Sequence, residues 1–188
     1  MTISKMAALG ALMVACILLV WMVVGSRKPE TEGAAAVAVV KGETYQDAGL
    51  GFAFEFPADW VKSDTPQLGA DATFLGPRRS DFTMSLDIRS DPTPTALGVY
   101  VDRSIKKVLP EYRTNFRLLE EATMIEGAVS AIRMAYTYRE GAFDLTNVQA
   151  VYALPDRKII LSFCLLSEHY EELKPVVDHT LKSFRQLR

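Results

Sequence analysis

The chain has 188 residues, of which 49% are hydrophobic and 23% are charged, and its formal net charge is −2. This length and mixture predict one globular domain with a short appendage. A slightly acidic chain lacks the basic surface that nucleic-acid-binding proteins carry, so we expect no nucleic-acid partner.

The first feature in chain order is an uncharged N-terminal segment. Residues 6–24 would form a helix about 29 Å long, close to the hydrocarbon thickness of a bilayer. Trp21 near its end is typical of an interfacial anchor, and Arg27 and Lys28 follow. The sequence therefore predicts a transmembrane anchor, a linker and a folded domain, at residues 1–28, 29–42 and 43–188.

Two other fates of this segment stay open. Cleavage after Ala34-Ala35-Ala36 would remove it, whereas Cys16, preceded by Met13-Val14-Ala15, loosely resembles a lipidated cysteine. With an uncleaved anchor, with cleavage or with lipidation, the domain would be targeted to a membrane or across it. The flanking charges nearly cancel under the positive-inside rule. We favour a single-pass protein with the domain on the periplasmic or extracellular side, the common orientation of an N-terminal signal-anchor.

Alternating hydrophobic residues predict strands in the next part of the chain. Residues 51–57 place three phenylalanines on one face, and residues 82–89 alternate cleanly. Between them, 72–75 reads as a short strand that Gly76-Pro77 should end. One more strand is predicted at 43–47.

A helix is predicted next, and four strands follow it. The apolar residues from Leu97 to Val108 recur at helical spacing, and Pro110 should stop the helix. The strands that follow fall at residues 116–124, 132–139, 143–153 and 159–166. In the third of these strands the apolar residues change phase, which a β-bulge near Asn147 would explain. Short turns between these strands favour an antiparallel meander.

A long amphipathic helix from Tyr170 to Leu187 ends the chain. Its first turns are acidic and its last turns basic, an order that suits the helix dipole. Each helix needs an apolar surface on which to bury its stripe, and the sheet supplies one. The predicted fold class is thus α+β: an antiparallel β-sheet with two helices packed on it, preceded by one transmembrane helix.

One stretch of sequence carries a resemblance to a known family. Gly51-Phe52-Ala53-Phe54-Glu55-Phe56-Pro57-Ala58-Asp59-Trp60 resembles the G-F-x-F-x-x-P-x-x-W opening of PsbP-like sequences. The strand order over about residues 44–187 is similar to that of the PsbP-like fold, which includes the DcrB-like proteins. The resemblance implies a non-enzymatic accessory role in binding a larger assembly. It supplies no binding residue, and the membrane helix departs from the lipoprotein members.

Few residues suggest a catalytic, redox or metal site. His169 and His179 are about 15 Å apart on one predicted helix, too far for one metal ion, and we expect them to be solvated or to lie at a helix cap. Cys164 reads as a small buried hydrophobe. We expect no catalytic site, cofactor or metal.

The candidate contact surface lies on the predicted meander. Arg133 and Arg139, with Asp144 across a hairpin, would line a polar sheet face that contacts a partner or ligand. Trp60 and Tyr45 would suit a carbohydrate, although Trp60 after a proline turn favours a core position. The leading hypothesis is a membrane-anchored accessory module that presents a sheet face or loops to a partner protein at the cell envelope. The alternative is a small-ligand or carbohydrate-binding domain.

Overall fold

The computed structural model describes residues 42–126 and 128–187. The predicted anchor, Cys16 and nearly all of the linker lie outside these described residues. None of the helices in the described part of the chain has the length and apolar character that a bilayer crossing needs.

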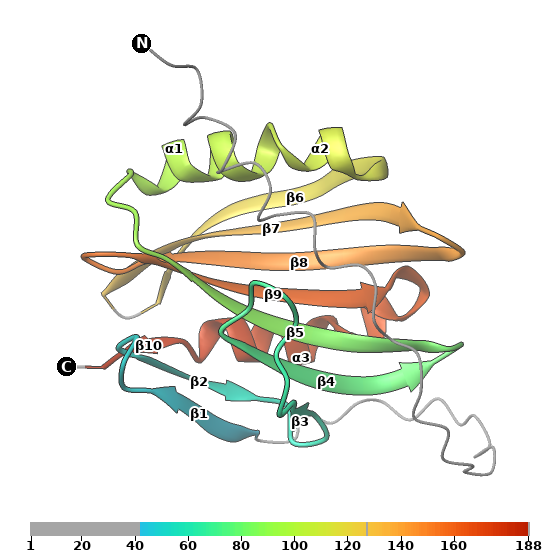
Figure 1. The fold of residues 1–188 in the computed structure, drawn as a ribbon, viewed down its shortest axis with the longest axis horizontal. Coiled ribbons are helices and arrows are strands. Elements are labelled where there is room, and N and C mark those ends of the chain that lie inside the picture. Colours follow the sequence, from blue (N-terminus) through green and yellow to red (C-terminus); the bar gives the residue numbers. More distant parts are fainter. Residues whose placement is uncertain (1–41, 127, 188) are drawn as a thin grey trace.

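The centre of the fold is a seven-stranded antiparallel sheet (Figure 1). Its strands run in the order β3-β4-β5-β9-β8-β7-β6, so the predicted meander of four strands is confirmed and β5 joins it beside β9. The strands are β3 (Val61–Lys62), β4 (Ala72–Arg79), β5 (Phe82–Asp91), β6 (Thr114–Glu126), β7 (Val129–Glu140), β8 (Phe143–Ala153) and β9 (Lys158–Leu166).

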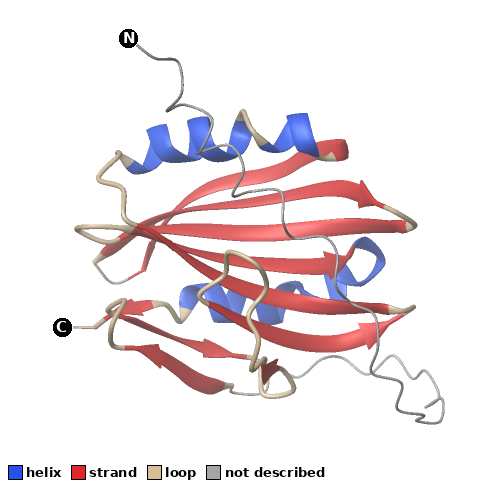
Figure 2. Cartoon of the chain, in the orientation of Figure 1, coloured by secondary structure: helices blue, strands red, loops and turns tan. Residues whose placement is uncertain are grey.

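A small second sheet and two helical segments complete the fold (Figure 2). The small sheet has the order β1-β2-β10, with strands β1 (Glu43–Asp47), β2 (Phe52–Phe56) and β10 (Arg185–Gln186). The first helical segment is α1 (Leu97–Val101), the π-helical η2 (Asp102–Lys106) and α2 (Leu109–Tyr112). The second is the 3-10 turn η3 (Ser167–His169) and α3 (Tyr170–Lys182). The predicted α+β architecture is confirmed for the described residues.

Each face of the large sheet carries its own hydrophobic core. On one face α3 and β2 cover β4, β5, β8 and β9, and Tyr152 of β8 stacks on Phe184 with ring centroids 3.8 Å apart. On the other face Val101 and Ile105 of the first helical segment pack against β7 and β8. The central strands are therefore buried on both sides, as a three-layer arrangement requires.

The predicted bulge near Asn147 is wrong. β8 pairs with β7 and β9 in unbroken register along its length. Leu145 and Val151 face the first helical segment, whereas Val148 and Tyr152 face α3. The apparent change of phase arises because two polar residues, Asn147 and Gln149, lie between Leu145 and Val151 on the face toward the first helical segment, and both faces of β8 are covered.

Two predicted helix and strand ends also need correction. Gly76-Pro77 does not end β4, because a register shift between Leu75 and Arg78 carries the strand past the proline. β3 pairs with β4 only at Phe74 and Leu75, so Pro77 lies beyond that pairing and its missing N–H breaks no bond to β3. Pro110 does not stop the helix either. It lies in the first turn of α2, where no intrahelical N–H is needed.

The C-terminal helix is shorter than predicted. α3 ends at Lys182, and the Ser183 hydroxyl accepts a 2.7 Å hydrogen bond from the Glu55 amide of β2. The chain then turns into β10, and the Leu187 amide donates to the Gly51 carbonyl at 2.8 Å. The end of the chain thus holds the small sheet beside α3.

Candidate functional site

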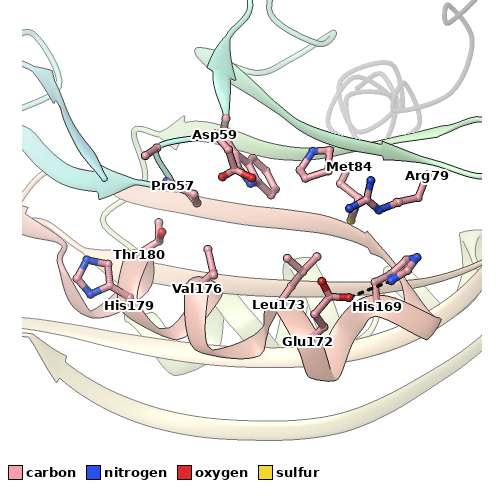
Figure 3. Close-up of a pocket in the computed structure, with 13 residues that line it drawn as sticks. Pro57, Asp59, Arg79, Met84, His169, Glu172, Leu173, Val176, His179 and Thr180 are labelled. Atoms are coloured by element: carbon pink, nitrogen blue, oxygen red, sulfur yellow. Dashed lines mark hydrogen bonds and ion pairs between the residues drawn. The ribbon is translucent and has the colours of Figure 1, made fainter. Parts of the chain in front are cut away.

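A cavity of about 460 Å³ opens between α3, the turn that follows β2 and the β4–β5 hairpin (Figure 3). Its apolar lining comes from three separate parts of the chain and consists of Pro57, Ala58, Trp60, Pro77, Met84, Leu173 and Val176. Its polar lining consists of Asp59, Arg79, His169, Glu172, His179 and Thr180. The volume falls within the range of small-molecule sites.

Trp60 forms the inner wall of this cavity. A turn closed by the 3.0 Å bond from its amide to the Pro57 carbonyl brings the indole inward, where it is 4% exposed. The ring meets Phe163 edge-on at 5.4 Å and lies directly against Gly76. The prediction that Trp60 is a core residue is confirmed.

The two histidines lie at opposite ends of the cavity, each beside a carboxylate. His169 Nδ1 is 3.3 Å from Glu172 (Figure 3). His179 Nε2 is 3.0 Å from Glu55 of β2. Both are partly exposed, and His169 stands at the N-cap of α3, which agrees with the prediction, but each histidine is also held beside a carboxylate. Among residues 42–126 and 128–187, no three acidic, histidine or cysteine side chains are grouped so that they would hold a metal ion.

Three polar groups around the cavity lack a protein partner. The Thr180 hydroxyl is buried and makes no hydrogen bond within the described residues. Asp59 and Arg79 are exposed at the rim and form no ion pair with any residue that the structure describes. Buried polar atoms are normally hydrogen-bonded, so the Thr180 hydroxyl needs an explanation.

Arg133, predicted at a polar sheet face, lies beneath α3 and is 6% exposed. Its guanidinium is 2.7 Å from Glu120 and 3.2 Å from Asp178, and it reaches the Tyr170 hydroxyl at 3.5 Å. Burial alone would lower the pKa of Arg133, but the hydrogen bonds and these carboxylates raise it overall. Arg133 therefore ties β7 to β6 and α3.

Arg139 and Asp144 form an exposed cross-strand pair with nitrogen and oxygen 3.8 Å apart. Their side chains are 49% and 70% exposed, so the pair is solvated, and Arg133 does not join it. The structure thus divides the three predicted site residues between two places. That they contact a partner or ligand stays a prediction.

A buried carboxylate lies on the opposite face of the sheet. Asp87 of β5 is 5% exposed and accepts hydrogen bonds from Thr73 at 2.7 Å and Ser85 at 3.4 Å. Burial raises its pKa above the ordinary value, although these hydrogen bonds and the charge of Arg89 act against the rise. On this face Cys164 is half-buried, with its Sγ 3.3 Å from the Tyr138 hydroxyl.

The outer edge of the sheet is formed by β6. Among the strands of residues 42–126 and 128–187 it pairs with β7 alone, and the register is continuous from Glu120 to Glu126 after two irregularities. Leu118, Leu119 and Ile125 are exposed by 40%, 44% and 72%. An edge strand with exposed apolar side chains is a template for pairing with another chain.

Sequence reasoning found Trp60 and the histidines but not the cavity they share. Asp59, Arg79 and Thr180 come from segments that are far apart in the chain, and only the packing of α3 against the two turns brings them together. Thr180 lies on the buried side of α3, together with Leu173 and Val177. Nothing local shows that its hydroxyl would lack a partner.

Comparison with known proteins gave matches at the level of structure. No model of a protein family matches the chain, and no curated protein matches it in sequence. The solution structure of cyanobacterial PsbP (CyanoP) from Synechocystis sp. PCC 6803 is similar, with 17% identity and a TM-score of 0.58. This match covers 82% of the present chain and 98% of CyanoP.

Two further solved structures are similar. LpqN of Mycobacterium tuberculosis, described as involved in cell envelope biogenesis, has 13% identity, a TM-score of 0.55 and coverage of 78% of this chain and 86% of its own. PA94 of Pseudomonas aeruginosa, a protein of unknown function and putative regulator, has 14% identity, a TM-score of 0.54 and coverage of 77% and 96%. At these identities the likeness concerns the fold, and the chain has the PsbP-like α+β fold.

Proposed function

We propose that the chain is a membrane-anchored, non-enzymatic accessory module that binds a partner protein at the cell envelope. Residues 1–28 would be the anchor, 29–42 the tether and 43–188 the binding domain. The uncharged segment at residues 6–24 supports the anchor. The likeness to LpqN, described as involved in cell envelope biogenesis, supports an envelope location. The domain would lie outside the cytoplasm, the common orientation of an N-terminal signal-anchor.

The observation that carries the binding role is the exposed edge of β6. The helices cover much of the sheet faces, so strand addition at the edge replaces the predicted open face as the contact. Continuous pairing from Glu120 to Glu126 keeps the outer backbone groups of β6 regular, and Ile125 offers apolar contact beside them. The partner would add an extended, partly apolar segment, since backbone bonding supplies affinity and side chains supply specificity.

Site-specific photo-crosslinking in intact cells tests this contact. A benzophenone amino acid at Leu119 should give one discrete adduct, and Ile125→Lys should abolish it while leaving circular dichroism unchanged. The matched control is the same probe at Val61, which is 68% exposed on the opposite edge strand β3. Equal adducts from both edges, or none from Leu119, would contradict binding at β6.

Protease accessibility tests the anchor and its orientation. The domain should be digested from outside in spheroplasts, and the membrane-bound form should keep the mass of an intact N-terminus. Protection until lysis would move the domain to the cytoplasmic side. A mass that begins after Ala36, or one that carries lipid at Cys16, would replace the anchor with one of the two other fates.

A second candidate function is binding of a small ligand. The cavity beside α3 favours it, since its lining combines an aromatic and apolar wall with unpartnered polar groups. This function is compatible with partner binding, because β6 lies at the far edge of the sheet from β4.

A further inference from the structure

We propose that the cavity beside α3 binds a small organic cation with an apolar body, an amine of the arylalkyl or alkyl class. The proposal concerns a site separate from the β6 edge and does not depend on the partner contact. It rests on the lining of the cavity, on one buried hydroxyl and on the distribution of charge around it.

The shape and lining set the apolar part of the ligand. A cavity of about 460 Å³ is larger than a few water molecules need, and its wall of Trp60, Met84, Leu173 and Val176 offers them few hydrogen bonds. Transfer of an apolar body from water to such a wall is favourable in proportion to the area buried. The ligand therefore has a hydrocarbon portion that lies along α3.

Thr180 marks the polar end of the ligand. Its side chain stands on the face of α3 that is turned to the cavity, below Pro57, and its residue is 1% exposed (Figure 3). Within the described chain the hydroxyl has no hydrogen-bond partner, not even the helix carbonyl that threonine often uses. A ligand N–H that reaches this oxygen would satisfy it.

The charges at the same end select a cation. Asp59 faces α3 from the opposite wall and has no ion pair among the described residues (Figure 3). Glu55 lies outside the cavity lining and is already paired with His179, 3.0 Å from its Nε2, so Asp59 is the carboxylate left for a ligand at this end. Arg79 lies at the His169 end, beyond Met84, so the ammonium group is assigned to the Asp59 end and the apolar body to the centre (Figure 3).

A matched series of probes tests the class. The full chain is held in phosphatidylcholine nanodiscs, and equilibrium dialysis measures 4-phenylbutylamine, 4-phenylbutanol and 4-phenylbutyrate at pH 7.5, with protein-free discs as the blank. The three share one apolar body and differ only in charge. We expect the amine to bind at least about fivefold more tightly than the alcohol, and the carboxylate to bind most weakly.

Two variants place the ligand in this cavity. Thr180→Val keeps the shape and removes the hydroxyl, so it should weaken the amine and the alcohol alike, by about fivefold. Asp59→Asn should weaken the amine by about two- to fivefold and leave the alcohol unchanged. Asp64→Asn, an exposed carboxylate outside the cavity lining, is the control and should change neither.

The position of binding is read independently from fluorescence. The sequence has two tryptophans, so Trp21→Phe leaves Trp60 as the reporter, and its emission should change on titration with the amine. The proposal is overturned if the carboxylate binds as tightly as the amine, if no probe binds above the blank up to about 10 mM, or if neither variant alters affinity. None of these results bears on the adduct at β6.

Discussion

Gly76→Ala tests whether the close packing of Trp60 shapes both the core and the cavity. A Cβ at position 76 would lie 2.5, 2.6 and 2.8 Å from three ring atoms of Trp60. Carbon atoms pack best at about 3.5–4.0 Å, so the indole would have to move by about 1 Å. It is held on its other side by Phe163, and we expect overpacking to cost about 1–3 kcal/mol of unfolding free energy.

Urea unfolding of the full chain, followed by far-ultraviolet circular dichroism, measures this cost. Gly98→Ala in α1 is the matched control, because a Cβ there meets no atom within 4 Å and should stabilise the helix by up to about 1 kcal/mol. Adding Trp60→Phe to Gly76→Ala should recover part of the loss, since a smaller ring leaves room for the methyl group. Equal unfolding midpoints for Gly76→Ala and wild type would refute this account of the contact.

Three further substitutions and one control test the packing of charged and polar groups. Burial raises the folded-state pKa of Asp87, so ionisation of this carboxyl lowers the unfolding free energy, and that loss disappears below the unfolded-state pKa of about 3.9. At pH 7 Asp87→Asn should have a higher urea midpoint than wild type, and its unfolding free energy should be higher by about 1.4 kcal/mol for each tenfold difference in proton affinity between the folded and unfolded states. Below about pH 4 the midpoints of the two proteins should match. Tyr152→Phe removes a 2.7 Å buried hydrogen bond to the Leu181 carbonyl and should lower the unfolding free energy by about 1 kcal/mol in the same assay. Arg133→Met should cost about 1–2 kcal/mol, because both partner carboxylates stay partly exposed, whereas Arg139→Met should change thermal stability by less than about 0.5 kcal/mol.

The strands were predictable because their signal is local. Alternation from Phe82 to Ile88 follows from a strand with one apolar face, and Met84, Leu86 and Ile88 are all buried. The ends of elements were less predictable. Pro77 continues a strand and Pro110 opens a helical turn because of where each falls relative to neighbouring strands and turns, which composition alone does not encode.

The candidate site was harder to predict for the same reason. A polar residue at a covered position, such as Asn147 or Arg133, reads in the sequence as a solvated one. Arg133 is buried because α3, which follows it by some forty residues, brings Asp178 to it. The partner that offsets the cost of burying such a polar side chain can be identified only from the packed structure.

The Thr180 hydroxyl should have opposite effects on the stability of the fold and on the binding of a ligand. Valine has nearly the same shape, and a buried hydroxyl without a partner costs about 1–3 kcal/mol. If the hydroxyl has no ligand to bind, Thr180→Val should raise the unfolding free energy and change nothing else. If it binds an amine, the same variant should be more stable alone but should gain less stability from saturating 4-phenylbutylamine than wild type does, since ligand stabilisation follows affinity. Thermal unfolding of both proteins with and without the amine measures the difference, and an equal gain in the two would show that the hydroxyl takes no part in binding.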